Sequence, residues 1–466
     1  MVQFDFYFEE EIKMKIIIAG DGKVGQALTR LLAQEGHDLV TIDSNPDILE
    51  TEMQDIDVIS LTGNCAAMDT LKEANIEQTE VLIAATSADE TNLLCCLTAR
   101  RMNPRLHTIA RVRSPEYTRQ LYMMREEFGL SLIINPEREA AREIFRLMQI
   151  PGVLKRETFA KGRVEIVELR INEGSLLENV ILHHLPHVLG GCKVLVCAVV
   201  RDGKAFIPTG DRTLRRGDHI YVTASVSSLS ELTKKMGVTQ KKIRHAMLVG
   251  GGRVCYYLAQ SLISAGVHVK IVEKDPDRCQ QLATLLPRAA VIQADGTVQS
   301  VLESEGLSEM DALVTLTGMD EQNIITSMYG NMQGVPNIIT KVNRMEMSGM
   351  LENLPVGSVI SPKELCSENI VQYVRAMGNQ AGAAVSVHRI AEGRVEALEF
   401  VVNKHSHHID EPLKSFKLKK NVLLACITRN GNTTIPDGNS TFRIGDTVIV
   451  VTNREEPIMQ FNDIFA

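Results

Sequence analysis

Two glycine-rich segments of the sequence have the residue spacing of a nucleotide-binding turn. The first, GDGKVG, runs from Gly20 to Gly25 and follows the apolar run KIIIA. In such a turn the first glycine permits a sharp bend from strand to helix, and Gly22 lets the backbone approach a pyrophosphate. The third glycine lets the helix pack on the strand. Asp43 follows eighteen residues after Gly25, and together these residues predict a dinucleotide site.

The carboxylate of Asp43 indicates which dinucleotide this site takes. At the end of a second strand it can accept hydrogen bonds from both hydroxyls of an adenine ribose, and its negative charge repels a 2′-phosphate. We therefore expect NAD(H) in the first site. A structural alternative is that Asp43 only caps the next helix through Ser44, Asn45 and Pro46.

Three further side chains follow the fourth and fifth expected strands. Thr86 and Ser87 end the fourth strand and Arg111 ends the fifth, so all three could line the ribose and phosphates at the crevice of an open sheet. Helix capping, with Asp89 alongside, and a surface ion pair are the structural alternatives. The candidate residues of the first site are Gly20, Asp21, Gly22, Lys23, Val24, Gly25, Asp43, Thr86, Ser87 and Arg111.

The second segment, AMLVGGGRVC, repeats the turn with changes. Gly250 and Gly252 hold the first two glycine positions, whereas Cys255 replaces the third, and Glu273 replaces the aspartate with a side chain one methylene longer. Arg253 could pair with a terminal phosphate, which would suit ATP or ADP, or it could point to solvent. We expect NAD(H) or ATP/ADP at Gly250, Gly252, Arg253 and Glu273.

Strands and helices alternate around both turns. Strand-like runs occur at 15–19, 38–43, 58–62, 81–86, 107–112 and 131–135, separated by stretches of helical pattern. Continuous apolar strands that alternate with helices predict a parallel sheet covered on both faces. The same order returns from about Ala246, and the distances from Gly20 to Gly250 and from Asp43 to Glu273 are both 230 residues, which indicates a duplication.

A different pattern follows each of these units, with alternating β-rich segments and one tight turn. Asp202-Gly203 and Asn430-Gly431 separate strand-forming runs, and both pairs suit a type I′ hairpin. We therefore predict an α/β protein with two Rossmann-like, doubly wound parallel-sheet lobes, each followed by a small α+β lobe. The expected lobes are residues 14–136, 150–235, 244–362 and 380–466.

Composition and charge exclude several classes of protein. Apolar residues make up 44% of the 466 residues, and the formal charge of −8 leaves no sequence-wide basic surface for nucleic acid. Nine cysteines without a CxxC pair favour a reduced cytosol, where Cys95-Cys96 should pack as core residues. The histidines of 183–187 and 405–408 lack companion ligands, so we expect no metal.

No run approaches the roughly 20 apolar residues of a membrane helix, so we expect the chain not to enter the membrane alone. Residues 1–13 fit neither a strand nor a helix, and they precede Met14. They form either a short extension or a segment upstream of the true start.

No catalytic constellation accompanies the glycine turns. A dehydrogenase would need a proton donor beside the nicotinamide and a substrate pocket, and neither is evident in the sequence. A nucleotide held without chemistry beside it indicates a sensor. An NAD-dependent dehydrogenase and an oligomeric scaffold that senses nothing are the alternatives.

The sequence resembles the TrkA family, the peripheral NAD-binding subunits of bacterial Trk potassium transporters, which contain tandem RCK (regulator of potassium conductance) units. The resemblance runs from Met14 to the C-terminus. It depends on MKIIIAGDGKVG, IDSNPD, TSADETN, the RVR after the fifth strand, and the RDGK and IPTGD of the small lobe.

The resemblance implies a function and an assembly. It implies a cytoplasmic regulatory subunit that gates potassium uptake in response to NAD(H) and ATP/ADP. It also implies a homo-oligomeric ring, expected to be a tetramer, on the inner face of the membrane beneath a potassium channel subunit of the TrkH/TrkG type. Asp21 departs from the small or uncharged residue usual at its position, and Cys255 departs from the third glycine, which predicts weaker binding at the second turn.

Overall fold

The computed structural model describes residues 13–50, 58–124, 127–149, 155–159, 164–224, 226–236, 243–343, 351, 354–377, 384–391, 393–454, 458 and 460–466. The two alternatives for the N-terminal segment concern residues that lie, apart from Lys13, outside this set. The chain forms two compact units. Unit 1 joins Met1–Glu139 to Pro362–Gly378, and unit 2 joins Ala140–Ser361 to Asn379–Ala466.

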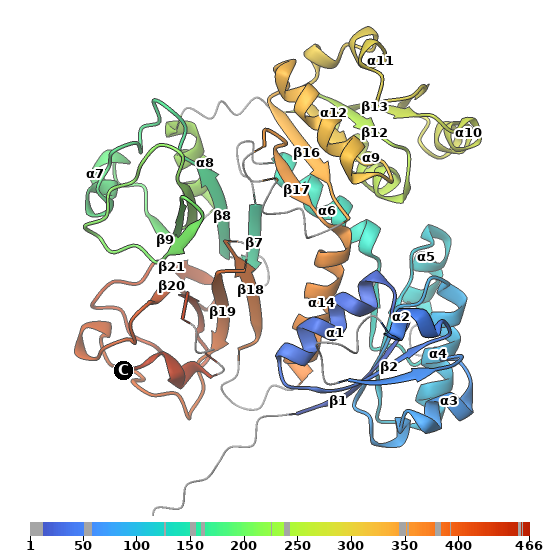
Figure 1. The fold of residues 1–466 in the computed structure, drawn as a ribbon. Helices are drawn as coiled ribbons and strands as arrows, with labels where there is room; N and C mark the ends of the chain where they lie inside the picture. Colours follow the sequence, from blue (N-terminus) through green and yellow to red (C-terminus); the bar gives the residue numbers. More distant parts are fainter. Residues whose placement is uncertain are drawn as a thin grey trace, which may run out of the picture. The chain divides into compact units, whose positions relative to one another are not determined.

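Unit 1 contains a six-stranded parallel sheet in the order β3-β2-β1-β4-β5-β6. This is the doubly wound order, in which the chain reverses direction across the sheet between β1 and β4 and opens a crevice at the carboxyl ends of these strands. Strands β1 and β2 of the sheet are labelled in Figure 1. The strands are β1 Lys15–Ala19, β2 Asp38–Asp43, β3 Ile59–Thr62, β4 Val81–Ala84, β5 His107–Arg111 and β6 Leu132–Ile134. The predicted parallel sheet is confirmed.

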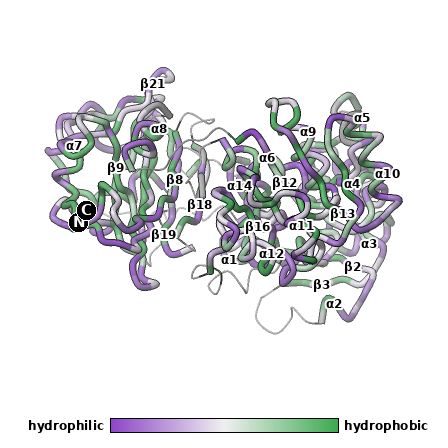
Figure 2. Tube along the Cα trace, turned by 90° about the horizontal axis from the view of Figure 1, so that it is seen from above, coloured by the Kyte–Doolittle hydropathy of each residue, from purple (hydrophilic) through white to green (hydrophobic). Residues whose placement is uncertain are grey.

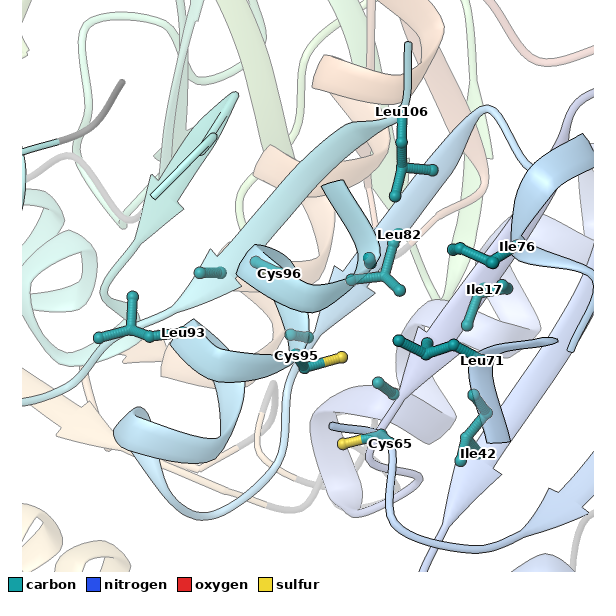
Figure 3. Packing of buried hydrophobic residues seen from close by; sticks show 14 of the residues in the cluster. Ile17, Ile42, Cys65, Leu71, Ile76, Leu82, Leu93, Cys95, Cys96 and Leu106 are labelled. Atoms are coloured by element: carbon teal, nitrogen blue, oxygen red, sulfur yellow. The ribbon is translucent and has the colours of Figure 1, made fainter. Parts of the chain in front are cut away.

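Helices accompany the sheet of unit 1. They are α1 Lys23–Gln34, α2 Pro46–Glu50, α3 Met68–Glu73, α4 Asp89–Met102 and α5 Pro115–Met123, while α6 Pro136–Gln149 begins in unit 1 and continues into unit 2. Apolar side chains of the sheet and of α3 and α4 form one buried cluster with Cys65, Cys95 and Cys96 (Figure 3). The cysteine pair therefore packs as core residues, as predicted, and burial raises the pKa of the Cys96 thiol.

One helix of unit 1 comes from a distant part of the sequence. Helix α14, Pro362–Met377, packs on α1, and its buried Cys366, Ile370 and Val374 share one apolar cluster with β1, β4 and α1. The Arg375 guanidinium donates a 2.5 Å hydrogen bond to Glu35, 340 positions earlier in the chain. A segment that follows the second lobe in sequence therefore completes the core of the first.

Unit 2 contains the second parallel sheet, in the equivalent order β14-β13-β12-β15-β16-β17. Its strands are β12 His245–Val249, β13 His268–Glu273, β14 Ala290–Gln293, β15 Ala312–Thr315, β16 Asn337–Lys341 and β17 Ser358–Ile360. Its helices are α9 Arg253–Ser264, α10 Pro276–Leu285, α11 Gln299–Ser304 and α12 Asp320–Met332. The duplication read from the sequence is therefore present in the fold.

Two small antiparallel sheets complete unit 2, in the orders β10-β9-β11-β8-β7 and β18-β19-β22-β20-β21. The first comprises β7 Lys155–Phe159, β8 Val164–Arg170, β9 Val194–Arg201, β10 Lys204–Phe206 and β11 His219–Ala224, with α7 Leu185–Val188 and α8 Val226–Lys235. The second comprises β18 Ser386–Ile390, β19 Val395–Val401, β20 Val422–Arg429, β21 Asn432–Thr434 and β22 Thr447–Thr452.

The hairpins of the small sheets turn at the predicted residues. Asp202 and Gly203 have φ of 49° and 69°, and Asn430 and Gly431 have φ of 49° and 84°, so all four lie in the left-handed region that a type I′ turn requires. Apolar residues of the two small sheets share a single buried cluster. Each small lobe is thus a β-rich unit, and the two bury apolar surface together.

Hydrophilic and apolar segments alternate along the described chain (Figure 2). Within the part that the structure describes, none of the helices is both long and apolar enough to cross a membrane.

Candidate functional site

The glycine turn of unit 1 lies at the carboxyl end of β1, in the crevice beside β4. Gly20 has φ of +95°, and a Cβ there would lie 2.6 Å from the Thr86 amide nitrogen. A Cβ on Gly25 would lie 2.1 Å from the Gly20 carbonyl oxygen, whereas a Cβ on Gly22 would meet nothing within 4 Å. Packing therefore requires the outer two glycines, and the middle one faces open space.

Asp43 connects β2 to this turn. One carboxylate oxygen accepts the Asp21 backbone N–H at 2.8 Å, and the other accepts the Asn45 backbone N–H at 2.9 Å. The contact with Asn45 is the local turn of the structural alternative, and the contact with Asp21 fixes the glycine turn. A carboxylate can accept about four hydrogen bonds, so each oxygen keeps capacity for a ribose hydroxyl.

The other residues of the turn differ in exposure. Asp21 is fully buried, and its Oδ1 would lie 3.5 Å from a Cβ on Gly25. Lys23, the first residue of α1, is exposed, and Val24 is buried. Among the predicted side chains of the turn, Lys23 is therefore the one that solvent reaches.

Thr86 lies two residues beyond the end of β4 and is held by Asn92 of α4. The Asn92 Oδ1 accepts hydrogen bonds from the Thr86 backbone N–H at 2.8 Å and from its hydroxyl at 2.7 Å. The Asn92 Nδ2 donates to the carbonyl oxygens of Thr86 and Arg111. Asn92 is fully buried, so it joins the loops after β4 and β5. Ser87, which follows Thr86, is exposed.

Arg111 ends β5, and its side chain reaches back toward β4. Its Nη1 donates to the Ala85 carbonyl oxygen at 3.3 Å, while its buried Nε has no hydrogen-bond partner among the described residues. Burial, and then the neighbouring Arg113, lower the pKa of the Arg111 guanidinium. An anion in this crevice would compensate both effects.

The turn of unit 2 repeats this geometry. Gly250 has φ of +100°, and a Cβ there would lie 2.8 Å from the Thr317 amide nitrogen, whereas a Cβ on Gly252 would meet nothing within 4 Å. Arg253 begins α9 and is exposed, like Lys23. Cys255 is fully buried at the third position. The two turns thus present the same open middle glycine and a cation at the first helical residue.

Glu273 performs in unit 2 what Asp43 performs in unit 1. Its oxygens accept the backbone N–H groups of Gly251 at 2.6 Å and Asp275 at 2.9 Å. The Asn323 Oδ1 likewise accepts hydrogen bonds from the Thr317 backbone N–H and hydroxyl, both at 2.8 Å. The Asn323 Nδ2 donates to the Lys341 carbonyl oxygen. The crevice is therefore duplicated in its hydrogen bonds as well as in its sequence.

Sequence reasoning missed three residues of these crevices. Asn92 and Asn323 lie in the repeated segments TSADETN and TGMDEQN, whose comparison could have revealed them. Arg278 of α10 was also missed, although its Nε donates to the Gly251 carbonyl oxygen at 2.7 Å. Its counterpart 230 positions earlier is Ile48, so the repeat gave no warning of a charged residue. The described residues contain no cluster of three or more metal-ligating side chains.

Comparison with known proteins identifies the family. The TrkA-N domain matches residues 16–136 and 246–362, and the TrkA-C domain matches residues 166–237 and 397–466. The chain belongs to the TrkA family. The resemblance recognised in the sequence is therefore confirmed, as are the tandem lobes.

Full-length relatives carry the same family name. A "Trk system potassium uptake protein TrkA homolog" of Archaeoglobus fulgidus is 29% identical over 454 residues, which cover 97% of this chain and 100% of the relative. The "Trk system potassium uptake protein TrkA" of Azorhizobium caulinodans is 26% identical over 94% of this chain and 95% of its own length.

Solved structures support the fold of this TrkA-family chain. The crystal structure of the GsuK RCK domain superposes with a TM-score of 0.61 at 16% identity, covering 96% of this chain and 94% of that one. A GsuK channel bound to NAD gives a TM-score of 0.60 at 16% identity, over 96% of this chain and 78% of the channel chain.

Proposed function

We propose that this chain is a nucleotide-responsive regulatory subunit of a Trk-type potassium uptake system. In this proposal the unit 1 crevice binds NAD(H), and the unit 2 crevice binds NAD(H) or ATP/ADP. The binding residues are the predicted ones together with Arg278, and the buried Asn92 and Asn323 position the loops beside them. The nucleotide that is bound then shifts the equilibrium between two conformations of the subunit. The shift is set by the difference in that nucleotide's affinity for the two conformations.

The duplicated acid-and-glycine turn carries the proposal. In each crevice a carboxylate at the end of the second strand accepts a backbone N–H of the turn, and the helix beyond an open glycine begins with a cation. This arrangement suits a ribose at the carboxylate and a phosphate at the helix N-terminus. GsuK, which has the same fold, is described in solved structures as bound to NAD and to ADP.

A regulatory role without catalysis fits these crevices better than a dehydrogenase. Hydride transfer would need a proton donor beside the nicotinamide, and the hydroxyls of Thr86 and Thr317 already donate to Asn92 and Asn323. Asn92 and Asn323 are each saturated by loop contacts. The relatives are likewise named as potassium uptake proteins.

We further propose that the chain acts in the cytoplasm as a homo-oligomeric ring, of four copies, beneath a membrane-embedded TrkH/TrkG-type subunit. Leu94 on α4 and Ile325 on α12 occupy equivalent positions of the repeat and are 53% and 67% exposed. Apolar side chains exposed at matching positions of both lobes suit contacts between repeated units.

Isothermal titration of NADH and ATP tests the proposal. The wild-type chain is compared with Asp43→Ala and Glu273→Ala, and each variant serves as the control for the other, because each leaves one crevice intact. We expect Asp43→Ala to abolish NADH binding in unit 1 and Glu273→Ala to weaken the unit 2 site alone.

Three outcomes would contradict the proposal. No saturable heat from the folded wild-type chain with either nucleotide would favour the scaffold. Turnover of NAD with any member of a metabolite panel would favour the dehydrogenase. Unchanged NADH affinity in Asp43→Ala would mean that the site is misplaced.

A further inference from the structure

The two crevices differ in charge at several aligned positions, one of which lies in the helix after the second strand. Residues 43–48, DSNPDI, correspond to residues 273–278, EKDPDR, so Ile48 of α2 corresponds to Arg278 of α10. Both side chains are half-buried. Unit 1 therefore has an apolar residue where unit 2 has a guanidinium.

Arg278 is fixed against the glycine turn of unit 2. Its Nε donates to the Gly251 carbonyl oxygen at 2.7 Å, and its Nη1 donates to Gln281 at 3.1 Å. Glu273 holds the Gly251 N–H, so both backbone groups of this glycine are engaged. Nη2 of Arg278 has no acceptor within the described part of the chain and is available to a ligand.

The second residue of each turn, directly after the first glycine, also differs. Unit 1 has the fully buried Asp21, whereas unit 2 has Gly251. A Cβ on Gly251 would lie 2.6 Å from Leu282 Cδ1 and 3.0 Å from a Glu273 carboxylate oxygen. A carboxylate is therefore present beneath the first turn and sterically excluded from the second.

The formal charge of the crevices follows from these exchanges. Residues 20–25 with 43–48 contain three acidic and one basic side chain, which gives −2, whereas residues 250–255 with 273–278 contain three acidic and three basic side chains, which gives 0. ATP carries a triphosphate and NAD(H) only a pyrophosphate, so the more negative ligand is favoured in the less negative crevice.

We infer that the unit 2 crevice prefers ATP to NAD(H), that the unit 1 crevice has the reverse preference, and that Arg278 is the residue that sets the choice in unit 2. The inference rests on the proposed function, because it chooses between the two ligands that the proposed function leaves open for the unit 2 crevice. Arg278 binds the phosphates electrostatically, so the preference weakens as salt rises.

Exchanging Ile48 and Arg278 tests this assignment. The unit 2 crevice is isolated in an Asp43→Ala background, and there Arg278→Ile should weaken ATP binding by roughly tenfold. The unit 1 crevice is isolated in a Glu273→Ala background, and there Ile48→Arg should strengthen ATP binding by a similar factor. Arg278→Lys is the charge-preserving control and should retain most of the affinity at low salt.

The gain expected from Ile48→Arg keeps the test decisive if Arg278→Ile unfolds α10. Unchanged ATP affinity in both exchanges, with melting curves like those of their backgrounds, overturns the inference and leaves the proposed function standing. Absence of binding by either nucleotide to the wild-type chain overturns both. A tenfold loss that is the same at 0.05 and about 1 M salt would contradict the electrostatic cause, because the screening length falls to about 3 Å at 1 M.

Discussion

Replacing Gly25 by alanine measures how closely α1 is packed against the turn that precedes it. The new Cβ would lie 2.1 Å from the Gly20 carbonyl oxygen and 3.0 Å from its carbonyl carbon. A backbone oxygen cannot rotate away as a side chain can, so the first turn of α1 must move. The movement would also displace Gly20, whose own Cβ position is already closed by Thr86.

The magnitude follows from two opposing effects. Overpacking costs about 1–3 kcal/mol, and a clash with the backbone belongs at the upper end of that range. Alanine inside a helix is about 1 kcal/mol more favourable than glycine. We therefore expect Gly25→Ala to lower the free energy of unfolding of unit 1 by about 2 kcal/mol, which lowers its Tm by about 4–8 °C.

Calorimetry of the full chain measures this loss, and hydrogen exchange of β1 and α1 assigns it to unit 1. The matched control is Gly22→Ala, because a Cβ there meets nothing within 4 Å and Gly22 has φ of −67°. We expect the control to lower stability by less than about 1 kcal/mol, because alanine is a poorer N-cap than glycine, and to weaken NADH binding. If Gly25→Ala melts with the wild type, the close packing assigned to this glycine is wrong.

Three further perturbations have defined outcomes. Asn92→Asp removes the two N–H donors that join the loops after β4 and β5, and it should lower unit 1 stability by about 2–3 kcal/mol in urea unfolding. Asp218→Asn breaks the bidentate pair with Arg201, at 2.7 Å for both contacts, and should speed hydrogen exchange in β9 and β11. Burial alone would raise the pKa of Glu35, but hydrogen bonds from its partners, Arg375 among them, lower it. This stabilisation is complete above the unfolded pKa of about 4.3 and is lost as pH falls through the lower folded pKa. In Glu35→Gln the free energy of unfolding should therefore fall less steeply as the pH is lowered.

The sequence predicted the strands of both sheets because their apolar runs are continuous and bounded by turns. It also predicted the two hairpins, because Asp202-Gly203 and Asn430-Gly431 are typical of type I′ turns when they lie between two strands. The predicted fourth strand ran to Thr86, whereas β4 ends at Ala84, because the loop that follows turns to meet Asn92.

Side-chain roles that depend on contacts across the sheet could not be predicted in the same way. Asn92 reaches the carbonyl of Arg111 nineteen positions away, and nothing in a helical pattern marks an asparagine as a link between loops. The packing of α14 on α1 was also beyond local pattern, because periodicity identifies an apolar face without identifying what covers it. The candidate residues of the crevice are those that spacing along the sequence defines, and their role in binding stays a prediction.

The position of α14 has a consequence for biosynthesis. Unit 1 needs a helix that begins at Pro362, although the rest of the unit ends at Glu139. At about 5–20 residues per second, the ribosome delivers that helix many seconds after the first sheet has emerged. During this interval the side of α1 that packs against α14 lacks that cover. The core of unit 1 is therefore complete only after about three quarters of the chain has been synthesised.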